Sequence, residues 1–108
     1  MACSEDMAET MRANLGVEPG LSETKMFGGL CFMLHGNIVC GVHSAWGMFR
    51  VGKHREGAAL NKGAQPLSFT GRKMGGMVEL DRDPFDNDAR RRDLIAFSLA
   101  NAASLPPK

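Results

Sequence analysis

The sequence predicts an α+β fold in two layers, with two helices on one face of an antiparallel sheet of four or five strands. Three observations predict it. Residues 4–15 and 86–104 repeat apolar side chains at helical spacing behind capping residues. Residues 30–42 contain two short apolar runs joined by a tight polar turn, the pattern of a central β-hairpin. Residues 48–51 and 77–80 are further short runs rich in strand-forming residues.

Length and composition indicate one ordinary globular unit. The 108 residues, 44% hydrophobic and 23% charged, are enough for one core, so we expect a single domain over residues 1–108. No basic leader precedes an apolar run, and no apolar stretch approaches the ~20 residues that cross a bilayer. Three cysteines without framework spacing are typical of a reducing compartment. We therefore expect a cytoplasmic protein with no membrane contact.

The N-terminal segment has the features of an amphipathic helix. Ser4 is placed to cap its start and Gly16 to end it. Met7, Met11 and Leu15 recur every four residues and form one apolar stripe. We expect this stripe to pack on the sheet.

The turn of the central hairpin has two possible positions. A two-residue loop of the type that needs positive φ could be His35-Gly36 or Gly36-Asn37. We favour His35-Gly36, because glycine then occupies the second positive-φ position. In that register Cys31 lies opposite Cys40, close to disulfide reach, whereas the other register makes the two thiols diagonal neighbours that cannot bond without distortion.

Side-chain alternation gives this hairpin two apolar faces. One face would carry Leu30, Phe32, Leu34 and Val39, and the other Cys31, Met33, Ile38, Cys40 and Val42. The two helices can cover only one face. We expect a second copy of the chain to cover the other, so the sequence predicts a homodimer whose contact face includes Met33, Ile38 and Val42.

The remaining segments have weaker signals. Residues 17–24 and 43–47 are expected to be loops, the second containing Trp46. Residues 53–60 predict a short helical turn, and residues 61–66 a loop. Arg90, Arg91 and Arg92 are expected on a solvated face of the last helix, because Asp86, Asp88 and Asp93 are close enough in sequence to pair with them.

No arrangement of residues predicts catalysis. The sequence lacks the motifs of zinc proteases, serine hydrolases and dinucleotide-binding enzymes, and nothing places a nucleophile beside a base. A metal site would need ligands beyond Cys31 and Cys40, and no Cys or His spacing supplies them. We therefore expect a protein that is not an enzyme and holds no metal and no cofactor.

The net charge of +1 conceals a segregation along the chain. Residues 1–23 carry −4, residues 24–78 carry +6 and residues 79–108 carry −1. The basic middle suggests an alternative function, the binding of a small anion or nucleotide, or contact with an acidic partner. The residues expected to take part are Lys53, Arg55, Arg72 and Lys73. Direct DNA binding is not expected, because no recognition helix or stacking surface is evident and the pI is about 7.8.

One stretch resembles a known family. Met26-Phe27-Gly28-Gly29, opening the hairpin, is similar to the N-terminal domain of the TfoX/Sxy family, the bacterial regulators of competence for DNA uptake. The resemblance covers roughly residues 5 to 108 and is typical of a branch in which this domain stands alone. It includes further segments in the same order, Gly41-Val42, Met48 to Gly52, Ala64 to Arg72, Gly76 to Val78 and Ser104 to Lys108.

The resemblance implies a fold and a kind of function. The implied plan is the two-layer one of secretion chaperones, many of which are dimers. Competence regulators join this domain to a helical C-terminal domain and act with the cyclic-AMP receptor protein at promoters. That second domain is not in these 108 residues. We therefore expect a protein-interaction module with a regulatory role, binding a second copy or another protein.

Overall fold

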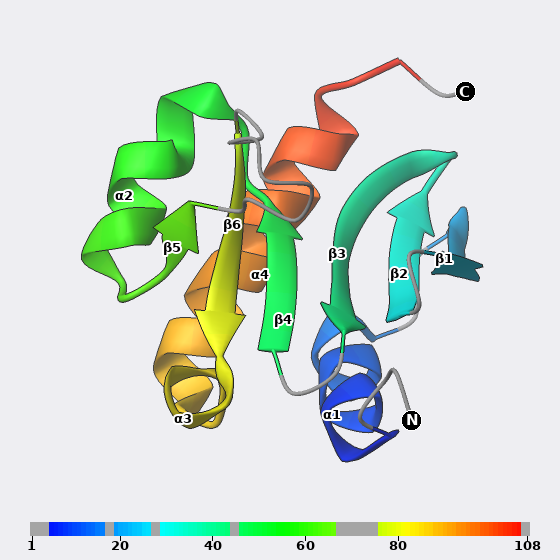
Figure 1. The fold of residues 1–108 in the computed structure, drawn as a ribbon. Helices are drawn as coiled ribbons and strands as arrows, with labels where there is room; N and C mark the ends of the chain where they lie inside the picture. The colour runs from blue at the N-terminus through cyan, green and yellow to red at the C-terminus, as the bar shows by residue number, and fades with distance from the viewer. Residues whose placement is uncertain (1–4, 17–18, 27–28, 44–45, 67–75, 107–108) are drawn as a thin grey trace.

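The computed structural model consists of one sheet with helices packed against one side of it (Figure 1). The structure describes residues 5–16, 19–26, 29–43, 46–66 and 76–106. Within them, six antiparallel strands lie in the order β1-β2-β3-β4-β6-β5. The elements are α1 (Glu5–Leu15), β1 (Leu21–Met26), β2 (Gly29–Leu34), β3 (Asn37–His43), β4 (Trp46–Arg50), η1 (Lys53–Arg55), α2 (Glu56–Asn61), β5 (Gln65–Pro66), β6 (Met77–Asp81), α3 (Arg82–Phe85) and α4 (Asp88–Ala103). The predicted α+β class is confirmed, with more strands than expected.

The two long helices begin and end close to the predicted positions. Gly16 follows α1 with φ of 68°, and its amide donates to the carbonyl of Arg12 over 3.1 Å. At the start of α4, the side chain of Asn87 accepts a hydrogen bond from the amide of Arg90. Both helices contact β3 and contribute to one hydrophobic core, so they lie on the same face of the sheet, as expected.

The hairpin turn is the one that the sequence favours. Leu34 lies opposite Asn37, which leaves His35-Gly36 as the two-residue loop between β2 and β3. Both loop residues have positive φ, 52° at His35 and 84° at Gly36. This prediction is confirmed.

A β-bulge in β3 overturns the predicted faces of that strand. Met33 lies opposite Ile38 and Phe32 lies opposite Cys40, so Val39 is an extra residue between two ladder pairs. Val39 and Cys40 both belong to the core beneath the helices. Beyond the bulge every residue of β3 has changed face, which puts Cys31 opposite Gly41 rather than opposite Cys40.

Three segments expected to be loops contribute residues to strands, and the shortest contribution is Gln65–Pro66, which form β5 within the predicted loop of residues 61–66. Strand β1 pairs with β2 along all six of its residues, although residues up to 24 were predicted to form a connection. Its central residues are exposed and polar, so it lacks the apolar alternation that identifies a half-buried strand. Trp46 begins β4 and lies opposite His43, so the predicted loop before it is shorter than expected.

The end of the sheet that is farther from α1, formed by β4, β6 and β5, is covered on the same face by the short helices α2 and α3. Ala59 of α2 and Phe85 of α3 are fully buried in the main core. A Cβ at Gly47 would lie 2.9 Å from the Phe85 ring, so glycine allows α3 to pack directly on β4.

No helix in the described ranges is long and apolar enough to cross a membrane.

Candidate interaction surface

The face of the sheet turned away from α1 and α4, which we call the outer face, carries apolar residues as well. Figure 1 views the sheet from this side, with α4 behind it. Cys31, Met48 and Met77 form a second hydrophobic cluster there, separate from the main core, and Trp46 packs against it. Among the described helices none lies over this face. The apolar residues of the sheet are therefore divided between two layers.

Local sequence explains how this cluster is built. A Cβ at Gly41 would lie 2.8 Å from the terminal methyl of Met48 and 2.6 Å from the carbonyl oxygen of Leu30, so only glycine leaves room for that side chain. At the end of the cluster the ring of Trp46 stacks on His43, with centroids 5.0 Å apart. Glycine at position 41 thus makes room for Met48, and stacking on His43 positions Trp46 at the end of the cluster.

Acidic residues border the outer face along β6. Glu79 lies opposite Met48, and Asp81 lies opposite Trp46. Burial raises the pKa of Glu79, and the neighbouring charge of Asp81 raises it further. At the rim of the apolar region, the carboxylate of Glu79 therefore ionises less readily than that of a free glutamate.

The residues predicted to form the dimer face do not all lie on the outer face. Met33 and Ile38 do, as a half-buried pair directly across β2 and β3. Val42 does not, because the bulge turns it into the main core, where it is 0% exposed. The predicted surface is therefore wrong at Val42.

The family motif forms the connection between β1 and β2. Met26 ends β1 opposite Gly29, which begins β2. A Cβ at Gly29 would lie 2.3 Å from the carbonyl oxygen of Val42, so the neighbouring strand requires glycine there. Phe27 and Gly28 lie outside the described residues. The part of the motif that the structure describes has a packing role.

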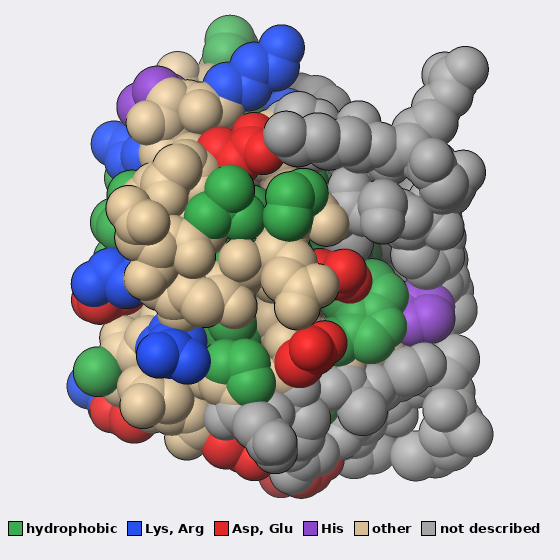
Figure 2. Space-filling view, turned by 60° about the vertical axis from the view of Figure 1, so that its left-hand side comes forward, with side chains coloured by type: hydrophobic (Ala, Val, Ile, Leu, Met, Phe, Trp, Pro, Cys, Tyr) green, Lys and Arg blue, Asp and Glu red, His purple; other side chains and the backbone are tan. Residues whose placement is uncertain are grey.

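The basic residues expected to bind an anion are only partly described. Lys53 is exposed and Arg55 is half-buried in η1, where an Arg55 guanidinium nitrogen (Nη1) lies 2.7 Å from Nε2 of His54. Arg72 and Lys73 lie outside the described residues. On the side where α2 and β5 lie, positive and negative side chains alternate over the part drawn in colour (Figure 2). The coloured part of that side shows no patch of one sign.

The two described thiols are separated by the sheet. Cys31 belongs to the cluster of the outer face and Cys40 to the main core, so the bulge removes the predicted contact between them. Burial raises the pKa of Cys31 to about 11 and raises that of Cys40 further. Both therefore stay protonated at neutral pH, a poor state for a nucleophile. In the described ranges no three His, Cys, Asp or Glu side chains gather as a metal site.

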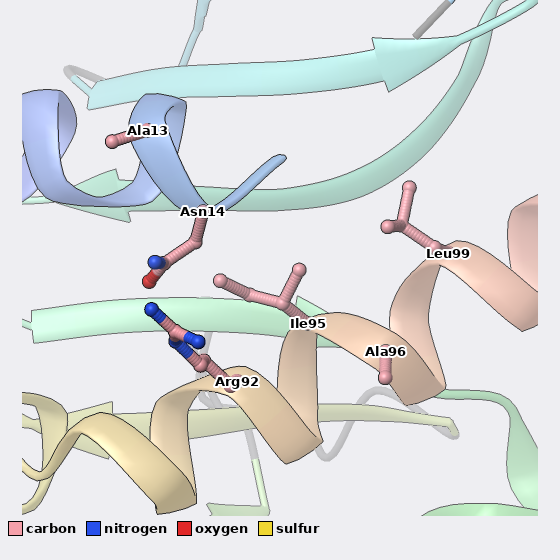
Figure 3. A pocket seen from close by; sticks show the side chains of 6 residues that line it. All are labelled: Ala13, Asn14, Arg92, Ile95, Ala96 and Leu99. Atoms are coloured by element: carbon pink, nitrogen blue, oxygen red, sulfur yellow. The ribbon is translucent and has the colours of Figure 1, made fainter. Parts of the chain in front are cut away.

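A groove between the two long helices was not predicted. It has a volume of about 400 Å³ and is lined by Ala13 and Asn14 of α1 and by Arg92, Ile95, Ala96 and Leu99 of α4. Figure 3 shows Asn14 and Arg92 pointing toward each other from the two helices, with Ile95 beside them. Arg92 also pairs with Asp88, its Nε lying 3.1 Å from Oδ2. The small side chains of Ala13 and Ala96 leave this gap between the helices. The sequence alone does not predict the groove, because the two alanines come together only when α1 packs beside α4.

Arg91, which was expected on a solvated face, is 6% exposed. Its guanidinium donates to Asn14 of α1, to the carbonyl of Phe85 at 2.9 Å and to Asp88. It also lies over the Phe85 ring, 5.6 Å from the centroid. One side chain thus joins α1, α3 and α4, which is a structural role.

Comparison with known proteins gives one result. The model of the TfoX N-terminal domain matches residues 15–102. No curated protein and no solved structure matches the chain. The matched range begins at the last residue of α1 and includes every strand and almost all of α4.

Proposed function

The chain belongs to the TfoX N-terminal domain family, and from that premise we propose that it is a non-enzymatic protein-interaction module with a regulatory role. We further propose that it acts as a homodimer. The outer face supplies the binding surface for a second, different protein.

The observation that carries the proposal is the unequal covering of two apolar sheet faces. Helices α1 and α4 cover one face, whereas Met33, Ile38 and Trp46 on the other remain partly accessible beside a buried cluster. Antiparallel sheets usually keep one face polar when it meets water. Apolar side chains retained on such a face are typical of a docking surface.

The chemistry of the outer face indicates the kind of partner. Its accessible centre is apolar, and its β6 border carries Glu79 and Asp81. A complementary partner would present an apolar side chain flanked by a basic residue or a hydrogen-bond donor. Methionine at position 33 adapts to different partner shapes, because its side chain is unbranched and flexible.

The thiols support the non-enzymatic part of the proposal. Cys31 and Cys40 are the best nucleophiles by residue type in the described chain, and burial raises the pKa of both. Anion binding by the basic middle is not proposed as a second function, because Lys53 and Arg55 alone do not make a site.

The proposal is tested by affinity capture from an extract of the native host under reducing conditions. We compare the wild type with Met33→Asp and Ile38→Asp, and use Leu60→Asp as the matched control, because Leu60 is an exposed apolar residue on α2. The wild type and Leu60→Asp should retain the same partner, and each outer-face variant should lose it. Equal capture by all four proteins, at equal thermal stability, would place the binding surface elsewhere.

A further inference from the structure

Strand β1 is an open edge of the sheet. It ends the strand order, and among the described strands β2 is its one neighbour. Six residues pair without interruption, and Ser22, Glu23, Thr24 and Lys25 are all exposed. An edge of this length with no proline and no bulge can accept another strand.

One hydrogen bond fixes which backbone groups point outward from this edge. The amide of His35 donates to the carbonyl of Gly20 over 2.9 Å, just before β1 begins. Because antiparallel pairs alternate between bonded and non-bonded, Ser22 and Thr24 direct their backbone groups toward β2. Leu21, Glu23 and Lys25 therefore direct theirs away from the sheet.

A second copy of β1 could pair with these groups in few symmetric registers. Two outward residues must face each other for the hydrogen bonds to form. Centring the pair on Glu23 or on Lys25 would oppose like charges. Centring it on Ser22 would leave Lys25 without a charged partner. Centring it on Thr24 places Glu23 opposite the partner's Lys25 twice, and the two threonines face each other on the axis.

The side chains on the helix side of β1 are arranged for this register. Glu23 accepts from Arg12 Nε at 2.6 Å and from Arg12 Nη2 at 2.8 Å, which holds its carboxylate in place. Lys25 lies on the same side, and in the described part of the chain it makes no ion pair. In a dimer, Lys25 of the partner subunit would reach the carboxylate that Arg12 already orients.

We infer that β1 pairs antiparallel with β1 of a second copy of this chain, with Thr24 on the twofold axis. The inference rests on the proposed function, since it locates the contact of the proposed homodimer. The axis is perpendicular to the sheet, so both helical layers lie on one side and both outer faces on the other. The outer face thus stays available for a different partner.

The sharpest test is a charge reversal with two complementary variants. Lys25→Glu and Glu23→Lys should each raise the dissociation constant of their own homodimer by about tenfold or more, because attractive cross-strand pairs become repulsive. Mixed together, the two variants should form a heterodimer in which every pair is attractive. Lys53→Glu makes the same charge change on an exposed residue of η1 and should leave the wild-type dimer intact. Circular dichroism and thermal unfolding establish that each variant is folded.

The shape of the dimer provides a second readout. Two six-stranded sheets joined edge to edge place their centres roughly 29 Å apart. Combined with the Cα radius of gyration of 12.4 Å for one chain, this separation predicts about 19 Å for the dimer by X-ray scattering.

The outcomes separate the inference from the proposal on which it rests. A wild type that sediments as a monomer at about 100 µM would overturn both the edge contact and the proposed homodimer. A dimer that resists both charge reversals would overturn the edge contact alone. In that case loss of the dimer in Met33→Asp would assign the contact to the outer face.

Discussion

The two edges of the sheet are built differently. Strand β1 offers six residues in unbroken register, with charges of both signs at its exposed positions. Strand β5, at the other edge, has two residues and ends in Pro66, and α2 packs against it. Proline and shortness exclude any added strand, because the necessary amides are missing or too few.

We infer from this difference that proline and shortness protect an edge against any added strand, whereas charge protects it only against strands of unsuitable charge pattern. A lysine on an edge strand repels a strand that carries another lysine opposite it. Glu23 and Lys25 are two residues apart on β1. An antiparallel copy of the strand centred on Thr24 therefore places each charge opposite a charge of the other sign. In the proposed register, such an edge would disfavour strands with other charge patterns and favour a second copy of β1.

Thr24→Pro should destabilise the single chain. Thr24 directs its amide toward Cys31 of β2. Proline removes that hydrogen bond and leaves the backbone carbonyl of Cys31 without its donor. We expect a loss of roughly 1–3 kcal/mol in the free energy of unfolding. Urea unfolding measures it. An unchanged midpoint would mean that β1 has the opposite hydrogen-bond alternation.

Lys25→Pro should leave the single chain intact and abolish the dimer. The amide of Lys25 points outward, a position where edge strands accept proline. We expect the free energy of unfolding of the single chain to change by less than about 1 kcal/mol. Analytical ultracentrifugation should show a monomer. A persistent dimer would argue that β1 is not the contact.

The Arg12–Glu23 ion pair should contribute a small, pH-dependent part of the stability. The hydrogen bond from Arg12 lowers the pKa of Glu23 below its ordinary value of 4.5, so the contribution is fully present above that value and is lost as pH falls through the lowered pKa. Both side chains are more than one-third exposed, so we expect less than about 1 kcal/mol at neutral pH. Urea unfolding of Lys25→Pro with and without Arg12→Gln measures it without association. A difference that persists at acid pH would assign it to the contact of Arg12 with Phe32.

Pro66→Ala should have the smallest effect. It restores an amide at the β5 edge, yet two residues are too few to support an added strand. We expect no change in sedimentation and a change in stability within about 0.5 kcal/mol. Association of a Lys25→Pro, Pro66→Ala double variant would show that proline alone had closed this edge.

Local signals were enough to predict the two long helices and the hairpin turn. Gly16 ends α1, Asn87 caps the start of α4, and His35-Gly36 supplies the two positive φ values of the loop. These features depend on residues that are neighbours in the chain. The sequence therefore contains them without reference to the rest of the fold.

The features that were missed depend on residues far apart in the chain. The bulge at Val39 exists only relative to β2, so nothing within β3 distinguishes it from a regular strand. That one residue moved Cys40 and Val42 to the other face. Arg91 differs from Arg90 and Arg92 only in its position relative to Asn14 and Phe85. Strand β1 was missed because an exposed edge strand needs no apolar alternation.

The bulge also has a consequence for sequence alignment. Removing Val39 would restore a regular ladder in which Met33 still faces Ile38 and Phe32 still faces Cys40, so no other side chain would change its face. The deletion would lower the free energy of unfolding by the contribution of one buried valine, about 1.5–3 kcal/mol. Removing a residue elsewhere in the hairpin would turn the side chains on one side of the deletion to the wrong face. We expect a one-residue gap in alignments of this family to fall at positions 39–40 when it falls in β3.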